Sequence, residues 1–258
     1  MPADWELPAG VSRGLWEYCH DPANARGYDA SLTGTPLVTI DEAFVLEHCK
    51  PPGRIIDLGA GTGRLSLALA QSGYQPVAVD LSPHMLAVLR EKAAVLGLDV
   101  PCVCANLVDL GAFADASFDH AACLFGTLGL ILGAEPRRRM LAHVRRILKP
   151  GGVFVLHVHN RWFNLWTGQG RHLLWQNWLD SWNGQSTPGD FEMPAQQGVG
   201  ILTMHLFTRA EIVGLLEEAG LEMIEARPLS LASDGRLRCP WWFPGFRSYG
   251  YLLASRKR

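Results

Sequence analysis

Hydrophobic residues along the chain fall into short continuous runs that alternate with longer segments of helical period. The runs are rich in apolar and β-branched residues, which is typical of strands buried on both faces. We expect strands at 54–57, 76–80, 102–105, 118–125 and 153–158, with helices following most of them. Strands that alternate with helices of this length indicate βαβ units, a parallel sheet and right-handed crossovers.

Capping signals predict where several helices begin and end. Ser82-Pro83 predicts a helix start, with the hydroxyl as N-cap and proline in the first turn, and Gly97 predicts its end. The segments 39–42 and 208–211 both have the form of a capping box. They predict helices from Thr39 to about Cys49 and from Thr208 to Gly220.

The chain is expected to form a single domain over 1–258. It would comprise an N-terminal arm and helix (1–50), a core (51–159), a Trp-rich insertion or lid (160–200) and a C-terminal helix with strands (201–258). A 40-residue segment without clear period is long for a loop and should be functional or locally helical. We interpret it as a lid over a ligand pocket that closes with the arm around Tyr28. The alternatives are a structural cap, a homodimer contact or a membrane-surface contact, the last disfavoured because the segment lacks dense Lys and Arg.

Composition excludes several classes of function. With a formal net charge of −2 over 258 residues, the chain has no global attraction for nucleic acid. The longest apolar stretch, Ala121 to Leu132, is too short to span a bilayer, so no stable membrane insertion is expected. The N-terminus has no signal-peptide pattern, and we expect a cytoplasmic protein. Cys102 and Cys104 alternate along a strand and are read as reduced thiols rather than metal ligands.

The most informative stretch is the turn Asp57-Leu58-Gly59-Ala60-Gly61-Thr62-Gly63. Alternate glycines permit positive φ and leave the backbone open to a ligand. The following helix presents N–H groups, so a ligand with a carboxylate or phosphate is expected there. The dinucleotide fingerprint G-x-G-x-x-G does not fit, because Arg64 follows Gly63.

This turn resembles motif I of the class I S-adenosylmethionine-dependent methyltransferases. The segment 149–152 is similar to the motif before strand five of that family, and 207–221 resembles its following helix and strand. The resemblance implies a Rossmann-like, doubly wound α/β fold with seven strands, mostly parallel, the last antiparallel. It is closest to small-molecule methyltransferases of the ubiquinone and menaquinone biosynthesis type.

The resemblance also implies which residues hold S-adenosylmethionine. Asp80, at the end of the second strand, would accept hydrogen bonds from both ribose hydroxyls, since a carboxylate offers two oxygens to a vicinal diol. The other implied cofactor residues are Asp57, Gly59, Ala60, Gly61 and Phe125 near the methionine portion, Leu81, Met85, Asn106 and Leu107 around the adenine, and Tyr28 in the arm. Each of these residues could instead have a purely structural role: Asp57 and Asp80 as loop carboxylates, Asn106 as a turn former and Phe125 as a core residue. Because the residues converge at strand ends, where open α/β sheets bind ligands, the cofactor role is favoured.

Methyl transfer from a sulfonium is an in-line displacement, which requires no universal catalytic residue. If a base assists, His159 is the candidate, because the resemblance places acceptor-facing residues at strands four and five. His157 shares its strand face, but packed histidines are the favoured interpretation and no metal is predicted. The fourth strand does not end in the Asn/Asp-Pro-Pro-aromatic sequence that enzymes methylating amino groups of nucleic acids resemble. Cys239-Pro240 also reverses the Pro-Cys order expected around the cysteine nucleophile of cytosine C5 methylation. Nucleic acid is therefore a poor acceptor.

The sequence thus predicts a methyltransferase acting on a small molecule. A non-catalytic S-adenosylmethionine-binding or assembly module is the alternative, and an NAD-binding oxidoreductase is a weaker one.

Overall fold

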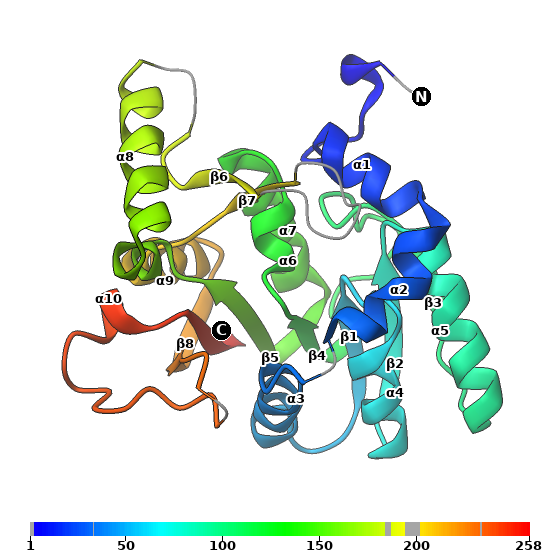
Figure 1. Cartoon of the computed structure of the whole chain (residues 1–258). Coiled ribbons are helices and arrows are strands. Elements are labelled where there is room, and N and C mark those ends of the chain that lie inside the picture. Colours follow the sequence, from blue (N-terminus) through cyan, green and yellow to red (C-terminus); the bar gives the residue numbers. More distant parts are fainter. Residues whose placement is uncertain (1–2, 33, 184–186, 194–201, 233) are drawn as a thin grey trace.

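A seven-stranded sheet forms the centre of the computed structural model, which describes residues 3–32, 34–183, 187–193, 202–232 and 234–258 (Figure 1). Across the sheet the strands are β3 (Cys102–Cys104), β2 (Gln75–Asp80), β1 (Arg54–Leu58), β4 (Phe118–Cys123), β5 (Leu148–His159), β9 (Gly250–Lys257) and β8 (Leu221–Leu229). Pairing is parallel from β3 to β5, and β9 is antiparallel to both of its neighbours. The predicted α/β fold, mostly parallel with the last strand antiparallel, is confirmed.

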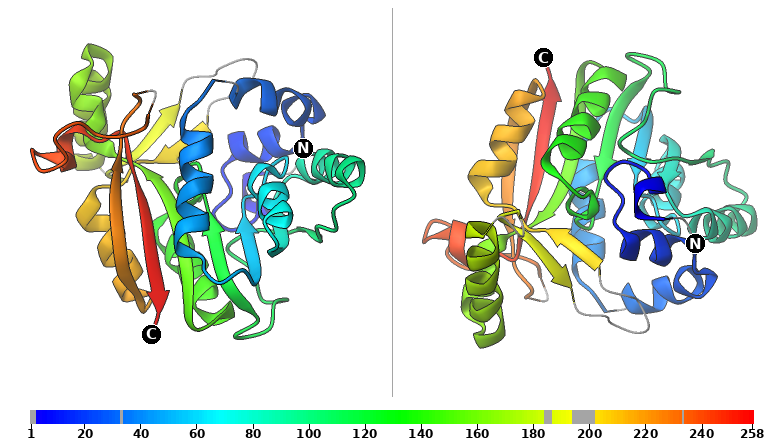
Figure 2. Two further views of the ribbon diagram at one scale, coloured as in Figure 1. Left: turned by 90° about the horizontal axis from the view of Figure 1, so that it is seen from below. Right: turned by 90° about the horizontal axis from the view of Figure 1, so that it is seen from above.

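Helices cover both faces of this sheet (Figure 2). One face carries α3 (Leu37–His48), α4 (Arg64–Gln71) and α5 (Pro83–Leu96), and the other carries α7 (Ala134–Ile147) and α9 (Arg209–Glu218). Within β1, Ile55 packs on the α3 and α4 side and Ile56 on the α7 side. Burial on both faces explains why this strand is a continuous apolar run rather than an alternating one.

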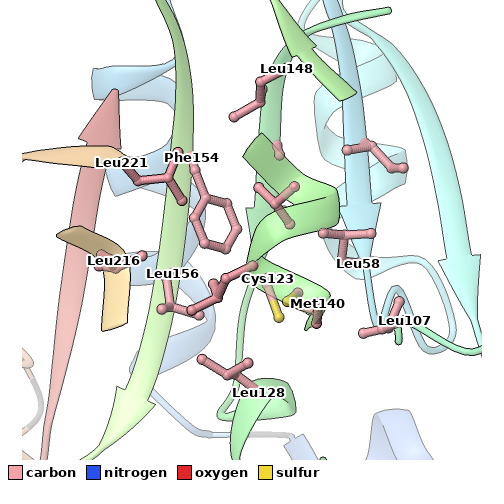
Figure 3. Packing of buried hydrophobic residues seen from close by; sticks show 14 of the residues in the cluster. Leu58, Leu107, Cys123, Leu128, Met140, Leu148, Phe154, Leu156, Leu216 and Leu221 are labelled. Atoms are coloured by element: carbon pink, nitrogen blue, oxygen red, sulfur yellow. The ribbon is translucent and has the colours of Figure 1, made fainter. Parts of the chain in front are cut away.

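Figure 3 shows part of the core on the second face. Met140 of α7 and Leu216 of α9 lie in one buried cluster with Phe154 and Leu156 of β5. This packing fixes the strands whose ends carry the predicted ligand residues.

The capping signals are confirmed for two helices. Ser82 Oγ accepts a hydrogen bond from Met85 N at the start of α5, and Gly97 ends that helix with a φ of 66°. At the start of α9, Thr208 Oγ1 accepts from Glu211 N while the Glu211 carboxylate accepts from Thr208 N.

The predicted helix start at Thr39 is wrong. Helix α3 begins at Leu37, directly after Pro36, whose fixed φ of −65° suits a helix start. Thr39 lies within the first turn of α3 rather than at its N-cap, so the predicted capping box does not form, and no side-chain hydrogen bond among the described residues caps this helix start. Strand β4 also ends earlier than expected, since Phe125 adopts a left-handed φ of 54°.

The arm and a small hairpin lie above the carboxyl ends of the parallel strands (Figures 1 and 2). The arm contains η1 (Asp4–Glu6), α1 (Arg13–His20) and α2 (Pro22–Leu32), and the hairpin pairs β6 (Asp190–Met193) with β7 (Leu202–His205). Helices α1 and α6 (Thr127–Leu130) both contact β7. The remaining elements are η2 (Arg161–Trp166), α8 (Gly168–Trp182) and α10 (Pro244–Arg247).

Within the described residues, no helix is long and apolar enough to cross a bilayer. Of the Trp-rich segment 160–200, positions 184–186 and 194–200 lie outside the described residues.

Candidate functional site

A cavity of about 260 Å³ lies where β1, β2, β3 and β4 end. Nine residues predicted for the cofactor line it: Tyr28, Gly59, Gly61, Asp80, Leu81, Met85, Asn106, Leu107 and Phe125. Sequence reasoning missed the rest of its wall, which is Gly10, Val11, Leu15, Tyr18, Cys19, Ser82, Thr127, Leu130, Ile131, Leu202 and Met204. Thr127 and Leu130 follow a strand end and could have been found from that position. The arm and hairpin residues carry no comparable local signal.

The Gly-rich turn is shaped by its own backbone bonds. Gly59 N and Ala60 N donate to Val79 O at 2.8 and 3.0 Å, and Gly61 N donates to the Asp80 carboxylate at 2.8 Å. These N–H groups are therefore engaged within the protein, and the anion site expected at the N–H groups of the following helix stays a prediction. Glycine is needed at position 59 for conformation, because its φ is 79° and a Cβ there would lie 2.5 Å from Thr127 Cγ2.

Asp80 is positioned to accept hydrogen bonds in the cavity. Its Oδ2 accepts from Gly61 N and its Oδ1 accepts from Ser82 N, both at 2.8 Å. Burial raises the pKa of this carboxyl, although backbone N–H donors partly offset the effect. Each carboxylate oxygen has a second lone pair. A ligand with two adjacent hydroxyls matches this arrangement.

Asp57 and Ala60 lie outside the cavity lining. The buried Asp57 Oδ2 accepts from Ser66 Oγ at 2.6 Å, and burial raises its pKa to about 6. Ala60 packs against the hydrophobic cluster between α4 and α5. Both residues support the turn from behind.

Asn106 fixes the arm at one edge of the cavity. Its Nδ2 donates to Ala9 O at 2.8 Å, and its Oδ1 accepts from Val108 N at 3.1 Å. The amide is thus engaged on both sides by backbone groups of the protein. Its neighbour Leu107 is buried and lines the same edge.

The arm is held against the Gly-rich turn by polar contacts. Asp29 accepts a hydrogen bond from Thr62 Oγ1 at 2.5 Å and forms an ion pair with Lys92 of α5. The ring of Tyr28, next to Asp29, lies over Gly61, where a Cβ would be 3.5 Å from its Cε1. The arm therefore closes the cavity from above.

His159 lies behind the cavity wall rather than in it. A Cβ on Gly126 would come within 2.7 Å of its ring, and its ring packs edge-on against His157 and Tyr249. Burial and the neighbouring His157 lower the pKa of His159 to about 3. The imidazole is neutral at pH 7 and a weak proton acceptor, so this geometry does not favour the predicted general base.

The tryptophans of the insertion do not cover the cavity in the described residues. Trp175, Trp178 and Trp182 of α8 are exposed and pack against one another, with ring centroids 5.1 and 5.3 Å apart in a tilted and an edge-on pair. The hairpin closes the cavity instead, because Leu202 and Met204 of β7 line it. These three tryptophans therefore do not form the lid, and the interpretation of segment 160–200 as a lid stays a prediction.

Comparison with known proteins identifies the core. Residues 55–152 match a family model described as a methyltransferase domain. A demethylmenaquinone methyltransferase from Clavibacter sepedonicus is 46% identical over 104 residues, which is 40% of this chain and 40% of that protein. The chain spans about half the length of the curated relatives it matches, between 40% and 57% for the first four.

Solved structures share the fold over most of the chain. An S-adenosylmethionine-dependent methyltransferase from Methanosarcina mazei superposes with a TM-score of 0.68 at 23% identity, covering 83% of this chain and 96% of that one. The 1,6-didemethyltoxoflavin-N1-methyltransferase of Burkholderia thailandensis, solved with 1,6-didemethyltoxoflavin and S-adenosylhomocysteine, gives 0.62 at 18% identity, covering 97% and 93%. Residues 55–152 are therefore similar to the methyltransferase domain family, and the chain has the fold of S-adenosylmethionine-dependent methyltransferases.

Proposed function

We propose that this protein transfers the methyl group of S-adenosylmethionine to a neutral small molecule with apolar or aromatic groups. The observation that carries the proposal is the composition of one cavity. Its lower half holds the residues expected at the cofactor, and its upper wall is mainly apolar and carries no charged side chain.

Asp80 would hold the cofactor ribose, with each carboxylate oxygen accepting one hydroxyl donor. Leu81 and Met85 offer apolar surface to the adenine, and Gly61 lets the methionine portion approach the backbone. Tyr28 and Phe125 supply aromatic surface beside it. When bound, the cofactor supplies an activated methyl group on a sulfonium.

The acceptor would occupy the upper part of the cavity. Val11 and Leu15 of the arm, Ile131 after α6, and Leu202 and Met204 of β7 surround that space without a charged side chain. Burying an unpaired charge there would cost several kcal/mol, so a neutral acceptor is favoured. In-line transfer then requires the acceptor atom about 3–3.5 Å from the methyl carbon in a site that excludes water.

The polar groups of the upper cavity can orient an acceptor without acting as a base. Tyr18 and Thr127 both line the cavity. Burial raises the pKa of Tyr18, so its phenol remains protonated at pH 7 and can donate a hydrogen bond.

The names of two similar proteins support a small-molecule acceptor. One is named for demethylmenaquinone, and the other is named for and solved with 1,6-didemethyltoxoflavin. A non-catalytic binding module would need the same cofactor-binding residues in the cavity. Turnover of an acceptor distinguishes an enzyme from such a module.

The test is S-adenosylhomocysteine formation from S-adenosylmethionine with neutral phenols, quinols and heteroaromatics, compared with carboxylates and amines. Only neutral acceptors should turn over. Met204→Glu should lower turnover by roughly tenfold or more, because it buries an unpaired carboxylate. Thr203→Glu is the matched control, since Thr203 lies on the opposite face of β7 and does not line the cavity.

Turnover restricted to charged acceptors, or equal loss in both variants, would contradict the proposed acceptor class. Cofactor binding without turnover of any acceptor would favour the binding module.

A further inference from the structure

Aromatic side chains are exposed together on a flank of the molecule that does not line the cavity. In the loop between β8 and β9, Trp241, Trp242 and Phe243 are 79%, 51% and 63% exposed. The adjacent η2 and α8 add exposed tryptophans, of which Trp182 is 76% exposed. We call the exposed aromatic residues of 166–182 and 241–246 the aromatic flank.

The two parts of this flank form one surface. Trp166 Nε1 donates to Phe246 O at 2.6 Å, and the Trp162 and Phe246 rings lie 5.9 Å apart. Figures 1 and 2 show α8 and α10 on the same side of the molecule. Because Trp166 contacts Phe246, aromatic rings from both parts can meet one partner at once.

The loop that presents Trp241 to Phe243 is held in shape by Arg247. Its guanidinium donates to Arg238 O, Cys239 O and Trp242 O at 2.9–3.1 Å and lies 4.9 Å from the Trp242 ring centroid. These bonds draw the ends of the loop together beneath the exposed rings. The rings are therefore exposed on a loop whose shape is held by hydrogen bonds from Arg247.

The charge of this loop selects the partner. Segments 166–182 and 234–248 contain four arginines (171, 236, 238 and 247) against two acidic residues, Asp180 and Asp234, although the chain as a whole has a formal net charge of −2. A two-fold contact through this loop would bring the arginines of both copies into one interface. The surface is therefore better matched by a negatively charged partner.

We infer that the aromatic flank docks the protein on an anionic lipid bilayer. Tryptophan and phenylalanine place their rings at the level of the headgroups, and arginines pair with lipid phosphates. A bilayer accommodates several protruding rings without a matching groove, whereas an acidic protein would have to supply one. The Trp-rich segment alone offers only Arg161 and Arg171 for this contact, and the fold adds the arginines of 236–247. Docking of this kind is peripheral and goes beyond the proposed reaction.

The experiment is co-sedimentation of the full chain with vesicles of phosphatidylcholine alone or of an equimolar mixture with phosphatidylglycerol. The protein should sediment with the anionic vesicles and remain free with the neutral ones. Arg236→Gln combined with Arg238→Gln should weaken binding roughly thirtyfold, because each basic residue near an anionic surface contributes about fivefold. Arg26→Gln, at an exposed arginine of α2, should bind like the wild type.

A second variant tests the aromatic contribution. Combined serine substitution of Trp241, Trp242 and Phe243 should abolish sedimentation with anionic vesicles, whereas Trp5→Ser, at a tryptophan that is 87% exposed in the arm, should not. The inference would be overturned if the wild type bound both vesicle types equally or bound neither. Full binding to anionic vesicles by the double arginine variant or by the triple aromatic variant would also overturn it. Sedimentation velocity tests the competing possibility of a dimer. If the wild type forms a dimer, the aromatic variant does not, and neither binds vesicles, the flank would be assigned to contact with a second copy.

Discussion

At the scale of single residues, the predictions that succeeded depend on local chemistry. The glycine spacing of 59–63 predicted the turn. Asp80 ends β2 and Phe125 comes shortly after β4, so their positions could be deduced from strand ends. The acceptors of the turn N–H groups could not be deduced, because Val79 O belongs to the neighbouring strand. His159 was predicted on the correct strand, but in the structure its ring lies behind Gly126 and not in the cavity. The sequence does not show how far a side chain lies from a cavity.

Gly59→Ala should destabilise the protein far more than Gly73→Ala. The two glycines have φ of 79° and 84°, but a Cβ at Gly59 meets Thr127, whereas nothing lies within 4 Å at Gly73. Positive φ alone costs about 1–2 kcal/mol for alanine, and the clash should add about 1–3 kcal/mol at Gly59. Urea unfolding measures both free energies. Equal losses would show that Thr127 moves aside without cost.

At the scale of elements, the hairpin of β6 and β7 is anchored by a buried histidine. His205 Nδ1 and Nε2 lie 2.5 and 2.7 Å from carboxylate oxygens of Asp190 and Glu211. Arg137 of α7 lies 3.6 Å from the same Asp190 oxygen, and Arg161 is a further cation near Glu211. This anchor could not be predicted, because its members come from separate elements that only the tertiary fold brings together.

The stability supplied by His205 should depend on pH. Burial opposes its charged form, but hydrogen bonds to Asp190 and Glu211 outweigh burial and raise its pKa. The stabilisation is therefore complete below the unfolded pKa of about 6.5 and is lost as pH rises through the higher folded value. The difference in unfolding free energy between wild type and His205→Gln should be largest near about pH 6 and should shrink toward about pH 9.

Urea unfolding across this range provides the measurement, with the exposed His172→Gln as control. A difference that is constant or grows with pH would contradict the anchor.

At the scale of the whole molecule, the alternation of strands and helices was sufficient to predict the sheet. A parallel sheet buried on both faces has a distinctive sequence pattern, and the predicted order of elements follows from it. The arm over the strand ends was anticipated at Tyr28 but not in its other cavity residues, and the union of η2 and α8 with the loop before β9 was not predictable. Both depend on surfaces that meet only after the core has formed. The division into 1–50, 51–159, 160–200 and 201–258 stays a prediction.

The central claim is that the cavity at the strand ends holds S-adenosylmethionine through Asp80. Calorimetric titration of the purified chain with S-adenosylhomocysteine tests it most directly. We predict one site per chain, with an affinity lowered between about tenfold and 100-fold in Asp80→Asn, since one charge-assisted hydrogen bond of about 1.5–3 kcal/mol is weakened. Asp99→Asn, at an exposed loop carboxylate, should bind like the wild type. Absence of binding to the wild type, binding of NAD in its place, or undiminished affinity in Asp80→Asn would contradict the account.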